Sequence, residues 1–126
     1  MTTLSMTWRT VCRADQLPVE RGVAVLLDEG QVAVIRTRDG GLYGVSHHDP
    51  FSGANVIARG IVGSTVVDGV VTPTIASPMY KQVFDLREGT CLSDPAVSLG
   101  SWPVRNEGGD IQIGQCLIRP TERADG

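Results

Sequence analysis

The chain has 126 residues, a formal net charge of −3 and 41% hydrophobic residues. This length and composition indicate one globular domain with one hydrophobic core and exclude a disordered chain. The acidic balance offers no basic surface, so we expect no nucleic-acid partner. No stretch is apolar and long enough to span a bilayer or to act as a secretion signal, so we expect a cytoplasmic protein with no membrane partner.

The cysteines give a second indication of compartment. Cys12, Cys91 and Cys116 are odd in number and show no paired spacing. This usage favours reduced thiols over a disulfide framework. We expect each thiol to act as a small buried hydrophobe.

The predicted elements are nearly all strands. Short β-branched runs recur about every ten residues, while apolar residues at helical spacing are not sustained, which predicts an all-β antiparallel sandwich or barrel. Hairpin turns are expected at Arg38–Gly41 and Asp68–Gly69, because glycine accepts positive φ. The expected strands are Trp8–Cys12, Val23–Leu27, Gln31–Arg36, Leu42–Val45, Ile61–Val67, Val70–Ala76, Gln82–Leu86, Ser101–Arg105 and Asp110–Ile113.

Some segments carry weaker patterns. Ala54–Gly60 is either a short helical turn or an irregular connector, and Ser93–Pro95 is expected to be a turn. Pro73, inside an expected strand, indicates an edge strand or a bulge. Whether Gln115–Ile118 extends the last hairpin is left open by the sequence pattern.

The core and the domain limits follow from the same patterns. We assign the large aromatic side chains Trp8, Phe84 and Trp102 to the core. Residues 1–118 are expected to form a single domain. Residues 119–126 are polar and are expected to form a disordered tail.

Two stretches between strands carry most of the distinctive residues. The first loop, Gly44–Gly53, contains two histidines, and the second loop, Ala76–Leu86, contains Ser-Pro-Met-Tyr-Lys-Gln. Each follows an expected strand. Loops placed this way on a β scaffold present a site at one tip of the molecule.

The arrangement of these loops resembles Rieske-type [2Fe–2S] domains. In that family a Cys-x-His loop and a Cys-Pro-x-His loop are followed by Phe-Asp-Leu and Gly-x-Cys-Leu, and Phe84–Leu86 and Gly89–Leu92 follow here. By this resemblance, Ser46 and His48 take the places of the first Cys and His. Ser77 and Tyr80 take the places of the second pair.

The ligand chemistry of a Rieske cluster does not fit these four residues. Such a cluster needs two thiolates on one iron and two imidazoles on the other. Ser46 and Ser77 offer hydroxyls, which are hard donors unsuited to replace thiolate, and Tyr80 supplies no imidazole. The three cysteines lie elsewhere in the chain. We therefore expect no cluster, no other cofactor and no metal on this chain.

A Rieske-like domain with these loops is similar to the small subunit of the assimilatory NAD(P)H-dependent nitrite reductases. The motifs that carry this resemblance are Asp49-Pro50-Phe51, Ala54-Asn55-Val56 and Ser77-Pro78 with Lys81-Gln82. The resemblance implies an accessory subunit that docks on a large subunit. In that family the large subunit carries FAD, an iron–sulfur cluster and sirohaem, and reduces nitrite to ammonia; the resemblance leaves NADH or NADPH open as donor.

Other functions remain as alternatives. The chain could be a cluster-free adaptor or ferredoxin-like component of another oxidoreductase, such as a ring-hydroxylating oxygenase, or an electron carrier with mixed ligands. A metal site at His47-His48-Asp49 is disfavoured because neighbouring side chains on an extended loop point apart. A nucleophilic Ser46 or Ser77 is disfavoured because neither serine lies in a Gly-x-Ser-x-Gly turn.

Several loop residues are candidates for contact with a partner. Tyr80 is either such a contact or a lid over the vacated cluster position, whereas Phe51 and Met79 are favoured as apolar plugs of the loops. His48 is expected to be hydrogen bonded within its loop. The candidate partner-binding residues are His47, Phe51, Arg59, Met79, Tyr80 and Lys81.

Overall fold

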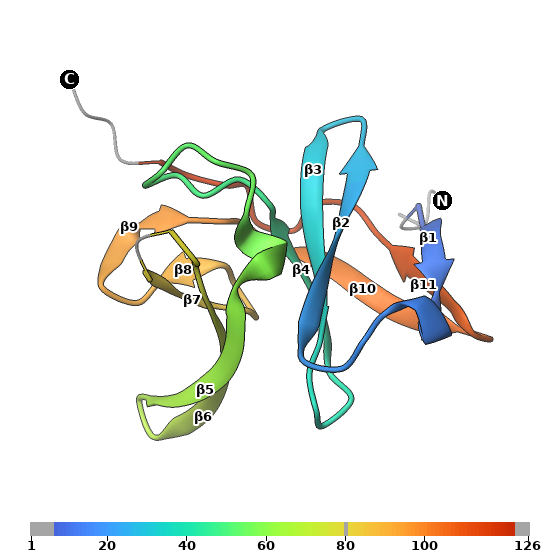
Figure 1. Cartoon of the computed structure of the whole chain (residues 1–126), viewed down its shortest axis with the longest axis horizontal. Helices are drawn as coiled ribbons and strands as arrows, with labels where there is room; N and C mark the ends of the chain where they lie inside the picture. The colour runs from blue at the N-terminus through green and yellow to red at the C-terminus, as the bar shows by residue number, and fades with distance from the viewer. Residues whose placement is uncertain (1–6, 80, 123–126) are drawn as a thin grey trace, which may run out of the picture.

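Two antiparallel sheets make up the computed structural model, which describes residues 7–79 and 81–122 (Figure 1). The first sheet has six strands in the order β1-β11-β10-β4-β3-β2, and the second has five in the order β5-β6-β7-β8-β9. The all-β antiparallel prediction is confirmed. The strands are β1 (Arg9–Arg13), β2 (Arg21–Leu27), β3 (Gly30–Arg36), β4 (Leu42–Ser46), β5 (Ile61–Val67), β6 (Val70–Ala76), β7 (Val83–Asp85), β8 (Thr90–Cys91), β9 (Asp94–Ser98), β10 (Trp102–Glu107) and β11 (Asp110–Ile113).

Both hairpin turns expected from glycine are present. The β3–β4 turn is closed by the Thr37 N–H, which donates to the Gly41 carbonyl at 2.9 Å. The β5–β6 turn has φ of 51° at Asp68 and 79° at Gly69. Positive φ at both central residues matches the right-handed twist of the flanking strands and so fixes the register of this hairpin.

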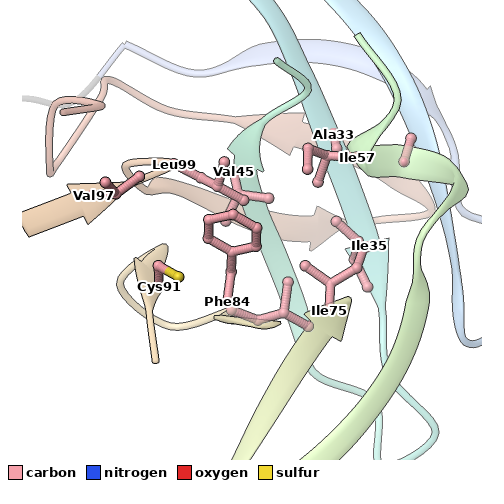
Figure 2. Packing of buried hydrophobic residues seen from close by; sticks show 11 residues of the cluster. Ala33, Ile35, Val45, Ile57, Ile75, Phe84, Cys91, Val97 and Leu99 are labelled. Carbon is pink, nitrogen blue, oxygen red and sulfur yellow. The ribbon is translucent and has the colours of Figure 1, made fainter. Parts of the chain in front are cut away.

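The main hydrophobic core lies between the two sheets. Ala33, Ile35 and Val45 come from the first sheet, and Ile75 and Phe84 come from the second. Figure 2 shows the Phe84 ring among these side chains, and the ring is fully buried. A second cluster, which includes Trp102, packs against the first sheet. The prediction that Phe84 and Trp102 belong to the core is confirmed.

Trp8 was expected in the core, and this prediction is wrong. Its ring is half-buried, and the strand β1 begins one residue later at Arg9. The guanidinium carbon of Arg105 lies 4.1 Å from the ring centroid. A cation stacked on an indole face stabilises the ring at the surface, so apolar size alone was misleading here.

Pro73 does not mark an edge or a bulge, because β6 is an interior strand between β5 and β7. Its carbonyl accepts a hydrogen bond from the Leu86 N–H at 2.9 Å, just beyond the end of β7. The N–H that proline lacks would face the same side. An interior strand tolerates Pro73 because the neighbouring ladder stops there.

The turn predicted at Ser93–Pro95 lies earlier, at Leu92 and Ser93, since β9 begins at Asp94. β9 is the outer strand of the second sheet, where a proline without an N–H leaves no ladder bond unmade. The short strand β8 was also not predicted.

The end of the chain is anchored further than expected. The N–H of Thr121 and the carbonyl of Ser98 are 2.9 Å apart, and the reverse bond has the same length. Ile118 pairs with Ser101 in the same way. Residues 119–122 therefore lie against the second sheet rather than in a tail, and residues 123–126 lie outside the described residues.

Ala54–Gly60 contains a short helical turn, η2 (Ile57–Arg59), which is one of the two interpretations offered by the sequence. This turn packs so closely on β2 that a Cβ on Gly22 would lie 2.7 Å from the Ala58 carbonyl oxygen. A second short turn, η1 (Ala14–Gln16), follows β1. In the part of the chain that the structure describes, no helix is long and apolar enough to cross a membrane.

The three cysteines are free thiols. Cys91 is buried in the main core, while Cys12 and Cys116 are half-buried against the second cluster. Burial raises the pKa of the Cys12 and Cys116 thiols above their ordinary value, so both stay protonated near neutral pH.

Candidate functional site

The two loops meet, as the sequence predicts, but each is shorter than expected. Gly44–Ser46 belong to β4, and Val83–Asp85 of the second loop form β7. The contact between the loops is a buried hydrogen bond in which Ser77 Oγ donates to Asp49 Oδ2 at 2.5 Å. Asp49 is fully buried, and Ser77 is 1% exposed.

Asp49 also organises its own loop. Its Oδ1 accepts the Phe51 N–H at 2.9 Å, and its main-chain N–H donates to the Ala54 carbonyl at 2.8 Å. A buried carboxyl group is expensive unless its oxygens are hydrogen bonded, and here both oxygens have donors. The sequence suggested Asp49 only as a weak metal ligand; its position beside the second loop could not be inferred from spacing.

Ser77 also organises its own loop. Its Oγ also accepts the Met79 N–H at 3.3 Å, and its main-chain groups bond to Gln82 and Lys81 at 2.8 and 3.0 Å. These bonds close the second loop into a tight turn. The hydroxyl therefore already has a donor and an acceptor partner in the protein.

His47 lies inside the molecule and is 7% exposed. Its Nδ1 accepts the Ala58 N–H at 3.0 Å, and its main-chain N–H donates to the Gln31 carbonyl at 3.0 Å. Burial, and then the positive charge of Arg59, lowers the pKa of His47 below its ordinary value. A neutral ring that accepts from Ala58 joins the first loop to η2, so His47 is part of the packing rather than of the surface.

His48 is the outer histidine. Its Nδ1 lies 3.1 Å from Asn55 Oδ1, and its Nε2 lies 3.5 Å from Glu122 Oε1. Its main-chain N–H donates to Ser46 Oγ at 3.2 Å. Both ring nitrogens thus have partners, and neither Asn55 nor Glu122 was singled out by the sequence as a neighbour of this ring.

An open groove runs beside the first loop. It has a volume of about 880 Å³ and is lined on the loop side by Ser46, His48 and Asn55. Val32 and Trp102 form part of its other wall. Ser77 and Asp49 are absent from its lining, so the groove borders the first loop but not the contact between the loops.

The remaining candidate contacts fall into two groups. Phe51 packs on the main core, with its ring centroid 6.2 Å from that of Phe84 and the rings tilted by 47°. The expectation that Phe51 plugs the loop is confirmed. Met79 and Lys81 are exposed on the second loop, so Met79 is not a plug; its side chain is 51% exposed. Tyr80 lies outside the described residues.

Arg59 does not lie with the loops. It is exposed at the end of η2 and lines a separate groove with Glu20–Gly22 and Gly60–Val62. Lys81 lines a different groove, over β5 and β6. The structure thus joins the two loops through Ser77 and Asp49, and it places Arg59 and Lys81 in separate grooves.

Known proteins share the sequence pattern and the fold of this chain. A family model for Rieske-like [2Fe-2S] domains matches residues 7–114. The NADH nitrite reductase small subunit of Escherichia coli K12 is 32% identical over 107 residues, which span 84% of this chain and 95% of that protein. The crystal structure of an NADH-dependent nitrite reductase small subunit from Mycobacterium tuberculosis superposes with a TM-score of 0.79. It is 44% identical and covers 90% of this chain and 99% of its own.

The chain belongs to the family of nitrite reductase small subunits. This confirms both the resemblance and the Rieske-like fold that the sequence predicts. A further relative is the NAD(P)H nitrite reductase large subunit of Klebsiella oxytoca, which is 34% identical over 117 residues. That match covers 91% of this chain but 12% of the Klebsiella protein, so this chain corresponds to about an eighth of its length.

A component of an oxygenase is less similar to this chain in sequence. The ferredoxin of a carbazole 1,9a-dioxygenase from Nocardioides aromaticivorans has a TM-score of 0.66 at 23% identity, covering 85% of this chain and 96% of its own. That likeness shows the shared fold.

The residues present do not fit a Rieske cluster. A Rieske cluster needs two thiolates and two imidazoles, whereas the positions expected for these ligands from the sequence pattern hold Ser46, His48, Ser77 and Tyr80. Within residues 7–79 and 81–122, no three His, Cys, Asp or Glu side chains form a group that could hold a metal ion. The Ser77 hydroxyl is moreover hydrogen bonded to Asp49.

The loop contact yields a stability prediction. Ser77→Ala removes the donor to a fully buried carboxyl oxygen, so we expect the free energy of unfolding to fall by about 1–3 kcal/mol. Ser46→Ala is the matched control: it removes a hydroxyl from a half-buried serine, where water can replace it, and should change stability by less than about 1 kcal/mol. Urea unfolding measures both, and equal losses would contradict a special role for the Asp49 contact.

His47 yields a pH prediction. Because its pKa is lowered in the folded state, the unfolded chain binds a proton first as the pH falls through about 6.5. Stability is therefore retained above that pH and lost below it, until the folded-state pKa is reached. His47→Asn keeps an acceptor for the Ala58 N–H but does not titrate. We expect the difference in unfolding free energy between wild type and this variant to change between pH 7 and 5 in that direction; a constant difference would contradict the assignment.

Proposed function

We propose that this chain is the accessory small subunit of a cytoplasmic NAD(P)H-dependent nitrite reductase that reduces nitrite to ammonia. It carries no redox centre and docks on a large subunit that holds FAD, an iron–sulfur cluster and sirohaem. The observation that carries the proposal is the 32% identity to the E. coli small subunit, with 95% of that protein covered.

The Klebsiella relative supports a large subunit as the partner. There, a segment similar to 91% of this chain is part of a protein described as a nitrite reductase large subunit. Joining two modules in one polypeptide gives them a high effective concentration for each other. A separate chain needs a binding surface to reach the same arrangement.

The surface best suited to this docking is the tip surface, which we define as the exposed side chains of Pro78, Met79 and Lys81 with the outer face of the first loop around His48. The Asp49–Ser77 bond supports it from beneath. A methionine beside a single cation offers adaptable apolar contact with one charge that selects the partner. We therefore expect an apolar, acidic patch on the large subunit.

A subunit without a cluster contributes geometry rather than electrons. Its rigid loops suit it to hold domains of the large subunit in place, or to stabilise the assembled enzyme, because loops on a packed sheet lose little freedom on binding. Electron transfer from NAD(P)H to nitrite then runs within the large subunit alone.

The absence of a redox centre is tested on the isolated chain. We expect protein purified without exposure to air to be colourless and to contain far less than one iron per chain, because two hydroxyls stand where thiolates are needed. Iron and sulfide analysis with visible absorption provides the measurement. Stoichiometric iron with inorganic sulfide would contradict the proposal.

Docking is tested with Lys81→Glu on the full chain and its co-expressed large subunit. Reversing this charge should weaken the complex at least about tenfold, or about 1.4 kcal/mol, because attraction to the acidic patch becomes repulsion. Co-elution and titration of nitrite-dependent NADH oxidation measure the effect. Arg38→Glu is the control, since Arg38 is exposed in the β3–β4 turn, at the end of the first sheet away from the first loop (Figure 1).

Two results would overturn this proposal. One is a large subunit that never co-elutes with the wild-type chain. The other is an equal effect of the Lys81 and Arg38 reversals, which would place docking elsewhere or make it a matter of net charge.

A further inference from the structure

The outer edge of the second sheet is formed by β5 (Ile61–Val67), which pairs with β6 on one side. In the described part of the chain, no other strand pairs with its free edge. Soluble proteins usually protect such an edge with a charge, a proline or a bulge. β5 has none of these: its sequence is uncharged, and its register against β6 is unbroken.

The backbone groups on that edge can be assigned from Pro73. It lies opposite Ser64, and its carbonyl bonds to Leu86 on the far side of β6. In an antiparallel pair, opposite residues direct their polar groups either both towards each other or both away. The N–H and C=O of Ser64 therefore face outward, and by alternation so do those of Val62 and Val66.

We propose that this edge pairs antiparallel with β5 of a second copy of the chain, with the twofold axis at Ser64. The two copies would exchange about six backbone hydrogen bonds through their outward-facing residues. This register also places Val62 of one copy opposite Val66 of the other. The two five-stranded sheets then form one continuous sheet.

The side chains along β5 are complementary to themselves in this register. Val66 is 65% exposed and would lie against the half-buried Val62 of the second copy. On the other face Ile61, which is 76% exposed, would lie opposite Val67. β-branched pairs across strands stabilise a sheet, and no like charges meet along the seam.

Charges at the two ends of the strand favour the same register. Asp68 follows β5, and the pairing would bring it opposite Gly60 of the second copy. Beside Gly60 lies an open groove of about 520 Å³ lined by Arg21 and Arg59. The acidic residue in that groove, Glu20, is 3.1 Å from Arg38, so the two arginines remain to attract Asp68.

The pairing uses a different element from the proposed docking on a large subunit. The tip surface lies at the loops that follow β4 and β6, whereas the seam would run along the outer edge of β5. Lys81 of the tip surface lines a groove with Ser64 and Thr65 of β5, so the two surfaces meet at that residue.

The test uses the full chain in sedimentation velocity over a range of concentrations. Wild type should reach twice the monomer mass. Ser64→Lys and Ser64→Glu, each alone, should lose the dimer, because like charges meet at the axis. An equimolar mixture of the two variants should recover it, because opposite charges then meet. Thr65→Lys is the matched control: it lies off the axis, opposite Gly63 of the second copy, and should keep the dimer.

Recovery on mixing separates the proposal from a folding defect. Amide exchange adds a second readout, since the N–H groups of Val62, Ser64 and Val66 should become protected as the dimer forms. The proposal is overturned if wild type stays monomeric at every concentration, if S64K alone remains dimeric, or if mixing S64K with S64E restores nothing. A monomer in which S64K instead weakens binding of the large subunit would assign this edge to that partner and also overturn it.

Discussion

The hydrogen bond from Ser77 to Asp49 is the contact on which the arrangement of the tip depends. It joins residues 28 positions apart in the chain, and it does so where both side chains are shielded from water. In a Rieske domain the cluster itself ties the two loops together through its ligands. Here a neutral hydroxyl and a carboxyl group perform that mechanical task, with the Phe51–Phe84 ring contact as a second tie to the core.

This contact explains how side chains alone can hold the two loops together. A buried serine hydroxyl could be left unsatisfied, yet Asp49 accepts a hydrogen bond from Ser77 Oγ and the Met79 N–H donates to that oxygen. His47 fastens the other side of the first loop to η2 through Ala58. The loops are held from both sides, which is the rigidity that a docking surface needs to bind without a large entropy loss.

The sequence predicts the fold well where local chemistry decides and less well where partners are remote. Asp68-Gly69 specifies its hairpin by its own backbone preferences, and the strands around it follow. Trp8 and Pro95 were not predicted correctly because Arg105, distant in sequence, covers the Trp8 ring and because Pro95 lies in the outer strand of the second sheet. The two loops could be located from residue identity. The role of Asp49 could not, since nothing near it in sequence indicates that Ser77 lies within reach.

The path of the last described residues has a practical consequence. Thr121 is fastened to Ser98, and the next residue, Glu122, reaches the His48 ring. A bulky group attached at Glu122 would therefore lie next to the first loop and screen it from any large molecule. The strand β1 and the last described residues lie on opposite sides of the molecule (Figure 1). Attachment to a support near β1 rather than near Glu122 therefore leaves the loops open to solution, and that is the geometry in which their recognition properties should be measured.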